Sequence, residues 1–475
     1  MPTRKYTYYD FTLSLCPECL KRVDAKIVFE EGNVFMLKRC KEHGNSKVLI
    51  ADDVEYYKNI RNYNKASEFP HHFNTKTDYG CPYDCGLCPD HEQHSCLTIV
   101  EVTDRCNLTC PTCFAGSSPT YGRHRTLEEV KAMLDTVVRN EKEPDVVQIS
   151  GGEPTIHPQF FEILDYAKTL PIRHLMVNTN GIKIAKDFEF AKRLATYMPD
   201  FELYLQFDSF NDAVLKELRG AELAKLHQQA IDHLNELNLS TTLVVTLQKG
   251  LNDHEMGDLI DYGLKQKAVR GVTFQPTQIA GRLDNFNAQT DRITLTEVRR
   301  KILEQSPIFN SDDLIPVPCN PDALVMGYAL KLGGETFPLT RYVNPKDLLS
   351  NASKNTIVYE QDEALHGKMI ELFSTGNSVE SANENLKSIM CCLPQIDAPE
   401  LGYDNLFRVI IMQFIDAYNF DVRAVKKSCV HIVNKDNKII PFETMNLLYR
   451  DDKVARLNNK AACTELGYLG FLVQL

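Results

Sequence analysis

From Leu97 onward, a short β-branched run is followed by a helical stretch, and this alternation repeats along the chain. The expected strands are residues 97–103, 145–150, 174–179, 202–207, 241–247 and 271–276, and helical periodicity between them is clearest over 126–140, 157–170 and 253–266. Six β/α units in succession require parallel strands joined by right-handed crossovers. The pattern predicts an α/β fold, a partial (β/α)6 barrel with its chemistry at the C-terminal ends of the strands.

The residues on either side of this array have a different character. Residues 1–96 are rich in Cys and contain an expected hairpin, 25–40, whose turn is at 30–33. Residues 291–475 mix helical segments with scattered Cys. We therefore expect three regions: an N-terminal metal-binding region (1–96), the barrel (97–290) and a C-terminal α+β cap (291–475). The sequence does not decide whether the cap holds a further metal cluster.

Charge and hydropathy indicate which partners and which cellular compartment to expect. The formal net charge is -11 and there is no long Lys/Arg run, so no nucleic-acid partner is expected. Neither a signal peptide nor an apolar run of about 18 residues is present, which predicts a cytoplasmic protein. Peripheral contact with a membrane stays open, although no basic amphipathic helix is identified to carry it.

Ten of the 15 Cys lie in the first 113 residues. In a reducing cytosol such a concentration favours metal binding or redox catalysis over disulfides. Cys106, Cys110 and Cys113 form CxxxCxxC directly after the first expected strand. Three thiolates suit a [4Fe-4S] cluster, which takes four ligands, so one iron is left open to an outside molecule.

A second motif, SerGlyGlyGluPro at 150–154, follows the second expected strand. Two glycines let the backbone approach a ligand closely, and Glu153 offers an acceptor for an ammonium group, although alone the motif reads as a tight turn. CxxxCxxC followed by an aromatic residue, together with this loop and the β/α order, resembles the radical S-adenosylmethionine (SAM) superfamily.

The resemblance implies a partial radical SAM barrel and assigns roles to the motif residues. SAM would chelate the open iron through its amino and carboxylate groups. The implied cofactor-binding residues are Phe114, Ser150, Gly151, Gly152 and Glu153, with Asn180 and Asp208 at the next two strand ends for the polar groups of SAM. A reducing partner such as ferredoxin or flavodoxin would supply one electron. The resulting 5'-deoxyadenosyl radical would remove hydrogen from an unactivated C-H bond of a small-molecule or lipid substrate.

The second group of thiols is Cys81, Cys85, Cys88 and Cys96. Because four thiols are present, we expect a fully protein-ligated auxiliary [4Fe-4S] cluster and prefer it to a structural zinc site. His91 and His94 lie between these ligands in sequence and are expected to be solvated loop residues.

The third group is Cys16, Cys19, Cys40 and His43, spaced as CxxC and CxxH on either side of the expected hairpin. This spacing predicts a tetrahedral site for zinc or a rubredoxin-like iron and leaves the choice of metal open. The remaining thiols are Cys319, Cys391, Cys392, Cys429 and Cys463. They hold a cluster only if the fold gathers them, and a buried Cys is otherwise an ordinary core residue.

The order of the motifs resembles the radical SAM group that includes the archaeal tetraether lipid synthase, also described as 7,8-dihydro-6-hydroxymethylpterin dimethyltransferase-like. The resemblance implies carbon-carbon bond formation on a lipid-like alkyl substrate, with methylation of a pterin-like ring as the alternative. The non-enzymatic alternative is a metal-binding electron carrier. The open iron argues against it, because a carrier does not need an open coordination position.

The chain departs from the pattern of this group near its end, with Asn320, Ser428 and Glu443 where further Cys are expected. These departures put the C-terminal cluster and the substrate in question. The apolar stretch 406–420, read at helical spacing, is expected to be core rather than the lining of a lipid tunnel. The electron donor and the oligomeric state are not given by the sequence.

Overall fold

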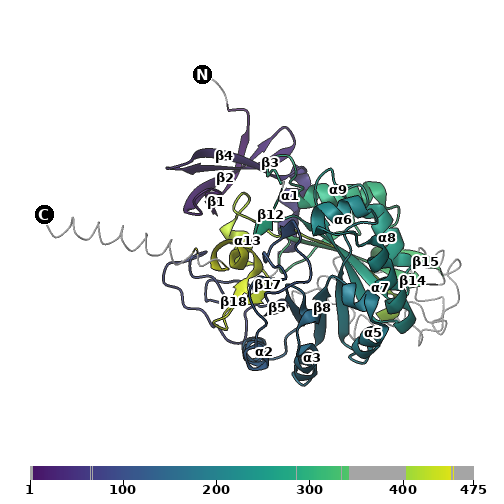
Figure 1. Ribbon diagram of the computed structural model, residues 1–475. Coiled ribbons are helices and arrows are strands. Elements are labelled where there is room, and N and C mark those ends of the chain that lie inside the picture. Colours follow the sequence, from purple (N-terminus) through teal and green to yellow (C-terminus); the bar gives the residue numbers. More distant parts are fainter. Residues whose placement is uncertain are drawn as a thin grey trace, which may run out of the picture.

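The computed structural model describes residues 4–341, apart from 65, 67, 285 and 333, together with 403–450 and 453 (Figure 1). Its N-terminal part is an antiparallel sheet in which neighbouring strands follow one another along the chain. The strands are β1 (Thr7–Leu15), β2 (Arg22–Glu30), β3 (Asn33–Cys40) and β4 (Gly44–Ala51). Glu31 and Gly32 have positive φ in the turn between β2 and β3, so the predicted hairpin is confirmed. A helix, α1 (Val54–Asn59), and a 3-10 turn, η1 (Ile60–Tyr63), follow.

Six parallel strands form the centre of a second, larger sheet and lie side by side in chain order. They are β5 (Leu97–Thr103), β7 (Val146–Gly151), β8 (His174–Thr179), β9 (Phe201–Gln206), β10 (Thr241–Leu247) and β11 (Val269–Pro276). Their bounds differ from the predicted ones by two residues at most. The predicted α/β fold with a partial barrel is confirmed.

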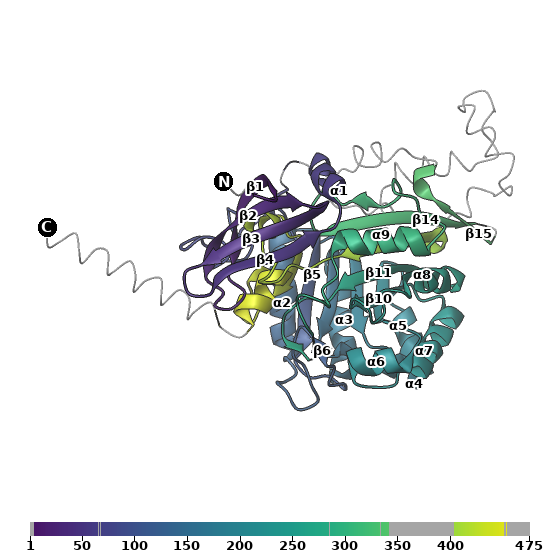
Figure 2. The same ribbon diagram turned by 90° about the horizontal axis from the view of Figure 1, so that it is seen from above.

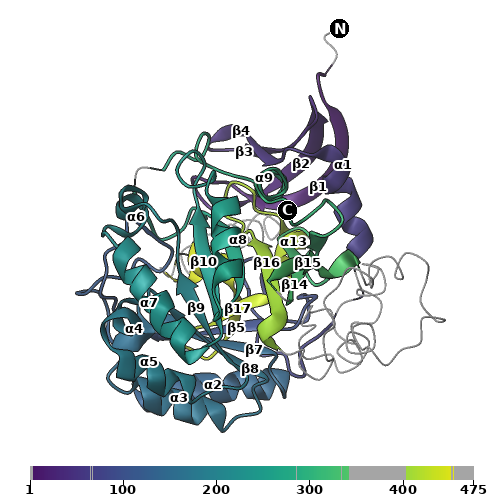
Figure 3. The ribbon, with the colours of Figure 1, turned by 90° about the vertical axis from the view of Figure 1, so that its right-hand side faces the viewer.

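Helices cover the outer face of this sheet, as Figure 3 shows. They are α2 (Leu127–Glu141), α3 (Phe160–Lys168), α4 (Ile182–Lys186), α5 (Phe188–Ala195), α6 (Asp212–Arg219), α7 (Ala224–Leu237), α8 (Met256–Lys265) and α9 (Leu295–Gln305). The 3-10 turn η2 (Pro154–Ile156) follows β7. The main core packs the strands against these helices. A capping box of Thr126 and Glu129 begins α2 and orients the chain between the first two strands.

The C-terminal region extends both edges of the same sheet. Beyond β11 lies β16 (Leu406–Met412), which runs parallel to it and pairs antiparallel with β14 (Leu324–Leu332); β13 (Ile315–Pro316) and β15 (Glu335–Pro338) flank β14. Beyond β5 lie β17 (Val430–Val433), which is parallel to it, and β18 (Ile439–Pro441). The short helical elements here are η3 (Leu339–Arg341), η6 (Tyr403–Asn405), α13 (Val422–Lys426), α14 (Phe442–Thr444) and the π-helical turn η7 (Met445–Tyr449).

The expectation of a helix over 406–420 is wrong at its start, because residues 406–412 form β16. Phe407, Val409 and Ile411 are fully buried on one side of this strand, and Arg408, Ile410 and Met412 face a cavity on the other. Both sides of the strand are therefore covered. Its sequence lacks the alternation of apolar and polar residues that identifies a strand, so it is equally compatible with a buried helix.

The N-terminal sheet packs on the C-terminal segment, and Figure 2 shows the two lying together. Lys38 on β3 donates to the carbonyl oxygens of Leu15 (2.9 Å) and Ala417 (2.6 Å), and the Asp52 amide donates to Thr296 Oγ1 (2.9 Å). The metal-binding region is thus attached to the large sheet by buried polar contacts. Among the residues described, no helix is both long and apolar enough to span a membrane.

Candidate active site and metal centres

The predicted cluster loop lies at the C-terminal edge of the central strands. Cys106, Cys110 and Cys113 follow β5 and all line one cavity of about 160 Å³. The same cavity is lined by residues at the ends of the next strands, namely Ser150, Asn178, Gln206, Thr246 and Gln275. The fold therefore brings the three thiols to the strand ends where such barrels carry their chemistry.

The segment after the sixth strand holds the cluster loop from outside. The short strand β12 (Arg282–Leu283) pairs with β6 (Thr112–Cys113) inside the loop. Arg282 donates through Nε to the Cys110 carbonyl oxygen (2.5 Å) and through Nη2 to that of Ser117 (2.7 Å). Gly281 has a φ of +65°, and a Cβ there would lie 2.4 Å from the Cys113 carbonyl oxygen. Only a residue without a side chain permits this approach.

Glu153 of the SerGlyGlyGluPro loop fastens two strand ends together. Its Oε1 accepts hydrogen bonds from the Thr155 amide (3.1 Å), the Thr155 hydroxyl (2.6 Å) and the Thr179 hydroxyl (2.8 Å), while Oε2 accepts from the Asn180 amide (2.8 Å). Burial raises the pKa of this carboxyl, and these hydrogen bonds oppose the rise. Glu153 lines the cavity, and its Oε2 accepts one hydrogen bond, from Asn180, whereas a carboxylate oxygen can accept two hydrogen bonds.

The two glycines of this loop lie against the start of the cluster loop. The amide of Gly152 donates to the Thr103 carbonyl oxygen (2.8 Å). A Cβ on Gly152 would lie 2.2 Å from the Arg105 carbonyl oxygen, and one on Gly151, whose φ is +134°, would lie 2.2 Å from that of Thr103. The glycines thus join the two motifs by backbone packing.

Of the two polar residues predicted to contact SAM, only Asn180 lines the cavity. Its Nδ2 donates to Asn107 Oδ1 in the cluster loop (2.7 Å). Asp208 is fully buried and is not among the described residues that line the cavity. It accepts two hydrogen bonds from Arg219, at 2.6 and 2.7 Å, and Arg219 lines the cavity in its place.

Two aromatic rings from the C-terminal region pack with one from the cluster loop at the cavity. Phe114, directly after the third thiol, lies 5.0 Å from Phe442 between ring centroids, and Phe442 stacks on Phe414 at 3.9 Å. All three rings line the cavity. The region from 403 to 450 therefore contributes to the active site as well as to the sheet.

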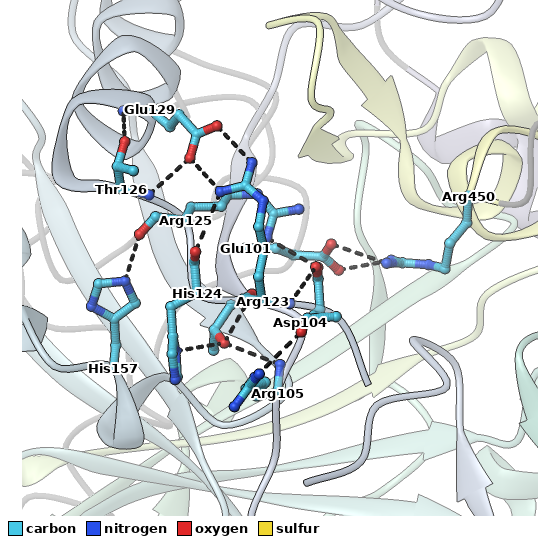
Figure 4. A network of polar contacts seen from close by, with 12 residues as sticks. Glu101, Asp104, Arg105, Arg123, His124, Arg125, Thr126, Glu129, His157 and Arg450 are labelled. Atoms are coloured by element: carbon cyan, nitrogen blue, oxygen red, sulfur yellow. Dashed lines mark hydrogen bonds and ion pairs between the residues drawn. The ribbon is translucent and has the colours of Figure 1, made fainter. Parts of the chain in front are cut away.

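A polar network holds the segment between the cluster loop and α2 (Figure 4). Asp104 accepts a hydrogen bond from Arg125 Nη1 (3.1 Å), and the carbonyl oxygen of Arg125 contacts His157 Nε2 (2.8 Å). Glu101 on β5, buried, pairs with Arg450 at 2.7 and 3.0 Å. These contacts fix both ends of the loop that carries the thiols.

Burial raises the pKa of the Cys106 thiol to about 12 and also raises that of Cys110, where the cationic Arg219 opposes the effect. Metal binding therefore has to displace protons from these thiols, as is usual for thiolate ligands. The three residues suit a [4Fe-4S] cluster, because they offer soft ligands on one side of a cavity and leave the other side free.

The N-terminal thiols form a compact site for one ion. Cys16, Cys19, Cys40 and His43 place one ligand atom each within 4.8 Å of all the others. His43 Nδ1 lies 3.5 Å from the sulfurs of Cys16 and Cys40, and the sulfurs of Cys19 and Cys40 are 3.9 Å apart. Around an ion with metal-sulfur bonds of about 2.3 Å, tetrahedral geometry places the sulfurs about 3.8 Å apart.

The expectation of one site made by Cys81, Cys85, Cys88 and Cys96 needs correction. Cys85 neighbours Cys81 and Cys88, whereas Cys96 lies with Cys319 and Cys429 in a separate group. The reason lies in the fold: Cys96 directly precedes β5 and Cys429 directly precedes β17, and these two strands pair in parallel. Cys391, Cys392 and Cys463 lie outside the described residues.

His91 and His94 are buried, contrary to the expectation of solvated loop residues. His91 Nε2 lies 2.8 Å from the Ser428 carbonyl oxygen and 3.1 Å from His431 Nε2. His94 Nδ1 lies 3.1 Å from Glu141 Oε2, and its Nε2 lies 3.6 Å from the Cys96 sulfur. Both histidines therefore belong to the packing around β5 and β17.

A second cavity, of about 540 Å³, lies on the inner side of the sheet toward the N-terminal ends of the strands. Its walls are largely apolar and include Met176, Met198, Phe201, Leu324, Met326 and Ile410. Leu97, Tyr204, Met412 and Val430 line both this cavity and the one at the cluster loop. The two cavities are therefore neighbours, separated by a wall of a few side chains.

Fold and site define an enzyme of the radical SAM class, which uses a [4Fe-4S] cluster and SAM. Residues 100–263 match the radical SAM superfamily, and residues 8–52 match the HMPTM N-terminal zinc ribbon domain. The 7,8-dihydro-6-hydroxymethylpterin dimethyltransferase of Methanocaldococcus jannaschii is 31% identical over 480 residues, covering 93% of this chain and 94% of the relative. The chain belongs to the family of that enzyme within the radical SAM superfamily.

Two further proteins match a little under half of the chain. GTP 3',8-cyclase of Pseudomonas fluorescens is 26% identical over 245 residues, which cover 49% of this chain and 69% of the cyclase. The solved structure of Streptococcus suis SuiB bound to S-adenosylmethionine is 17% identical, with a TM-score of 0.37 over 44% of this chain and 46% of that chain.

Sequence reasoning missed Arg219 and Arg282, two cations that contact the cluster loop or line its cavity. Arg219 ends α6 and reaches the cavity, where Arg219 Nη2 also donates to Gln206 Oε1 (2.7 Å) and Thr246 Oγ1 (2.9 Å). Each follows a predicted strand at some distance, and nothing in the local pattern separates it from a surface arginine. Only the fold shows that both turn back to the thiols.

Proposed function

We propose that this enzyme forms a carbon-carbon bond at an unactivated carbon of a lipid-like alkyl substrate. The observation that carries the proposal is the apolar cavity of about 540 Å³, which adjoins the cavity of the three thiols through Leu97, Tyr204 and Met412. An alkyl chain is stabilised by such walls at about 25 cal/mol per Å² of apolar surface removed from water. An alkyl chain in this cavity reaches the cluster cavity when the side chains of the shared wall move aside.

When bound, the reduced cluster and SAM supply the 5'-deoxyadenosyl radical that abstracts hydrogen. The residues of the chain hold the cluster and SAM and exclude water. Cys106, Cys110 and Cys113 hold the cluster, and the Glu153 loop together with Asn180 supports binding of the amino and carboxylate groups of SAM. The rings of Phe114, Phe414 and Phe442 exclude water from the place where the radical would form, which protects it from side reactions.

A pterin-like ring is a second candidate substrate, favoured by the family relative, which is a pterin dimethyltransferase and covers nearly the whole chain. Polar side chains suited to a heterocycle, including Gln148, Gln206 and Gln275, line the cluster cavity. In that reaction a SAM methyl carbon would enter the product, whereas coupling of two alkyl carbons leaves that methyl in methionine.

The test uses anaerobically reconstituted enzyme, dithionite, and SAM labelled with ¹³C in its methyl group. Two substrates are compared: a dialkyl glycerol phospholipid with perdeuterated chains, and 6-hydroxymethyl-7,8-dihydropterin. We expect deuterium from the lipid in 5'-deoxyadenosine and a coupled lipid product without the label. Labelled methylpterin, with no deuterium transfer from the lipid, would establish the second candidate instead.

A blocked cavity gives an independent check. Met176→Trp adds bulk to the wall of the apolar cavity, and Met176 does not line the cluster cavity. We expect lipid turnover to fall at least tenfold while SAM cleavage without substrate continues. Lys192→Trp, on the exposed part of α5, is the matched control for an added indole and should leave both unchanged.

A further inference from the structure

Three thiols that are distant in sequence meet beside the apolar cavity. Cys96 precedes β5, Cys319 lies in the turn between β13 and β14, and Cys429 precedes β17. Each is 3 or 4% exposed, and all three line the cavity of about 540 Å³. The Leu97 amide donates to the Cys429 carbonyl oxygen (3.1 Å), so the first and third thiols are fixed to each other by the backbone.

The spacing of these thiols is that of ligands around one ion. All three sulfurs lie within 4.8 Å of one another, and those of Cys319 and Cys429 are 3.3 Å apart. In a [4Fe-4S] cluster each thiolate binds a different iron, so its sulfurs are more widely spaced. Within the described part of the chain, the cluster-loop thiols do not form such a compact group, whereas the N-terminal zinc-ribbon ligands do.

The surroundings of Cys96 resemble the outer shell of a metal site. His94 Nε2 lies 3.6 Å from its sulfur and Gln93 Nε2 donates to that sulfur at 3.8 Å. The other ring nitrogen of His94 lies 3.1 Å from Glu141 Oε2, so a carboxylate orients the imidazole. Partners of this kind stabilise the charge on a ligating thiolate and fix its direction.

We propose that Cys96, Cys319 and Cys429 bind a single zinc-type ion at a third metal site, with the fourth coordination position open to the apolar cavity. Among the described residues, no fourth Cys, His, Asp or Glu atom joins the group. Because the three thiols all line the same cavity, the uncovered side of the ion faces it. Three protein ligands and one open position are typical of catalytic zinc, which takes water or an oxygen, nitrogen or sulfur donor of a substrate there.

The first test counts metals in anaerobically purified protein. Compared with the wild type, Cys429→Ser should contain about one zinc less per chain and the same amount of iron. Cys40→Ser, at the N-terminal site, should lose a different metal ion, so that the double variant shows both losses. Unchanged zinc in Cys429→Ser, or a loss of about four irons, would overturn the proposal.

Zinc X-ray absorption of the wild-type protein tests the open position without any variant. Both the N-terminal site and the proposed site supply three sulfurs, so the mean environment should be three sulfurs at about 2.3 Å and one nitrogen or oxygen. A mean above three sulfurs would mean that the new site has a fourth thiolate, from Cys391 or Cys392 for example, and would refute the open position. This result does not depend on the substrate of the enzyme.

Discussion

Asp208 and Arg219 form a bidentate ion pair that lies behind the cluster cavity, with oxygen-nitrogen distances of 2.6 and 2.7 Å. Arg219 reaches the cavity, whereas Asp208 is fully buried behind it and also accepts from the Thr246 amide (2.8 Å). Asp208, predicted from the sequence to contact the polar groups of SAM, thus has an indirect role. It orients the guanidinium of Arg219 beside Cys110.

Asp208→Asn should leave the largely buried Arg219 without the charge of its carboxylate partner and with one of the two acceptor oxygens replaced by an amide nitrogen. Removing one partner of a buried pair costs about 3–5 kcal/mol, so the variant should unfold at lower urea concentration. We also expect SAM cleavage to fall by about tenfold or more, because the guanidinium loses its orientation. Lys216→Met on the same helix removes an exposed pair with Glu222 and should cost under about 1 kcal/mol. Equal effects of the two substitutions would contradict this role of Asp208.

Gly152→Ala tests the backbone contact between the two motifs. The added Cβ would lie 2.2 Å from the Arg105 carbonyl oxygen, next to the first cluster thiol, so the loop must shift. We expect reconstituted protein to lose most of the SAM-dependent change in its paramagnetic resonance signal. Gly116→Ala is the matched control, because nothing lies within 4 Å of a Cβ there, although its φ of +64° adds modest strain. If Gly152→Ala behaves like the control, the close packing has no functional consequence.

Glu443 predicts a pH dependence of stability. Burial raises the pKa of its carboxyl to about 7, while the Ser428 hydroxyl donates to it at 2.8 Å. Since the folded protein holds this proton more tightly than the unfolded chain, stability is fully present below about pH 4.5 and falls as the pH rises toward 7. The loss should amount to about 3 kcal/mol at pH 7.5.

Glu443→Gln keeps the shape and removes the titration. In urea unfolding, the variant should gain stability relative to the wild type between pH 4.5 and 7.5, and the difference should level off above pH 8. A difference that does not change with pH would show that Glu443 does not titrate in this range.

The strands were predictable because each carries a β-branched run bounded by turn residues, as in 97–103 and 241–247, and these bounds agree with the structure. Residues 406–412 were misread because both sides of β16 are covered, which removes the alternation that identifies a strand. The sequence also placed the cluster-loop thiols and Glu153 correctly at strand ends, since these motifs are local.

Sequence reasoning could not identify ligands that are distant from one another in the chain. Cys96 was grouped with the three thiols before it, whereas the pairing of β5 with β17 and the turn before β14 bring Cys429 and Cys319 to it. Spacing rules apply to ligands on one loop or hairpin and say nothing about thiols more than 200 residues away. The replacement of expected Cys by Ser428 and Glu443 gave a hint, because these two side chains form a buried hydrogen bond beside Cys429.

The most direct test of the account compares the wild type with Cys110→Ala in the reductive cleavage of SAM. Both proteins are reconstituted anaerobically and reduced with dithionite, and 5'-deoxyadenosine is measured with SAM as the only added substrate. We predict 5'-deoxyadenosine from the wild type and none from Cys110→Ala, which should also contain about four irons fewer per chain. No 5'-deoxyadenosine from the wild type, or equal amounts from both proteins, would contradict a SAM-binding cluster held by Cys106, Cys110 and Cys113.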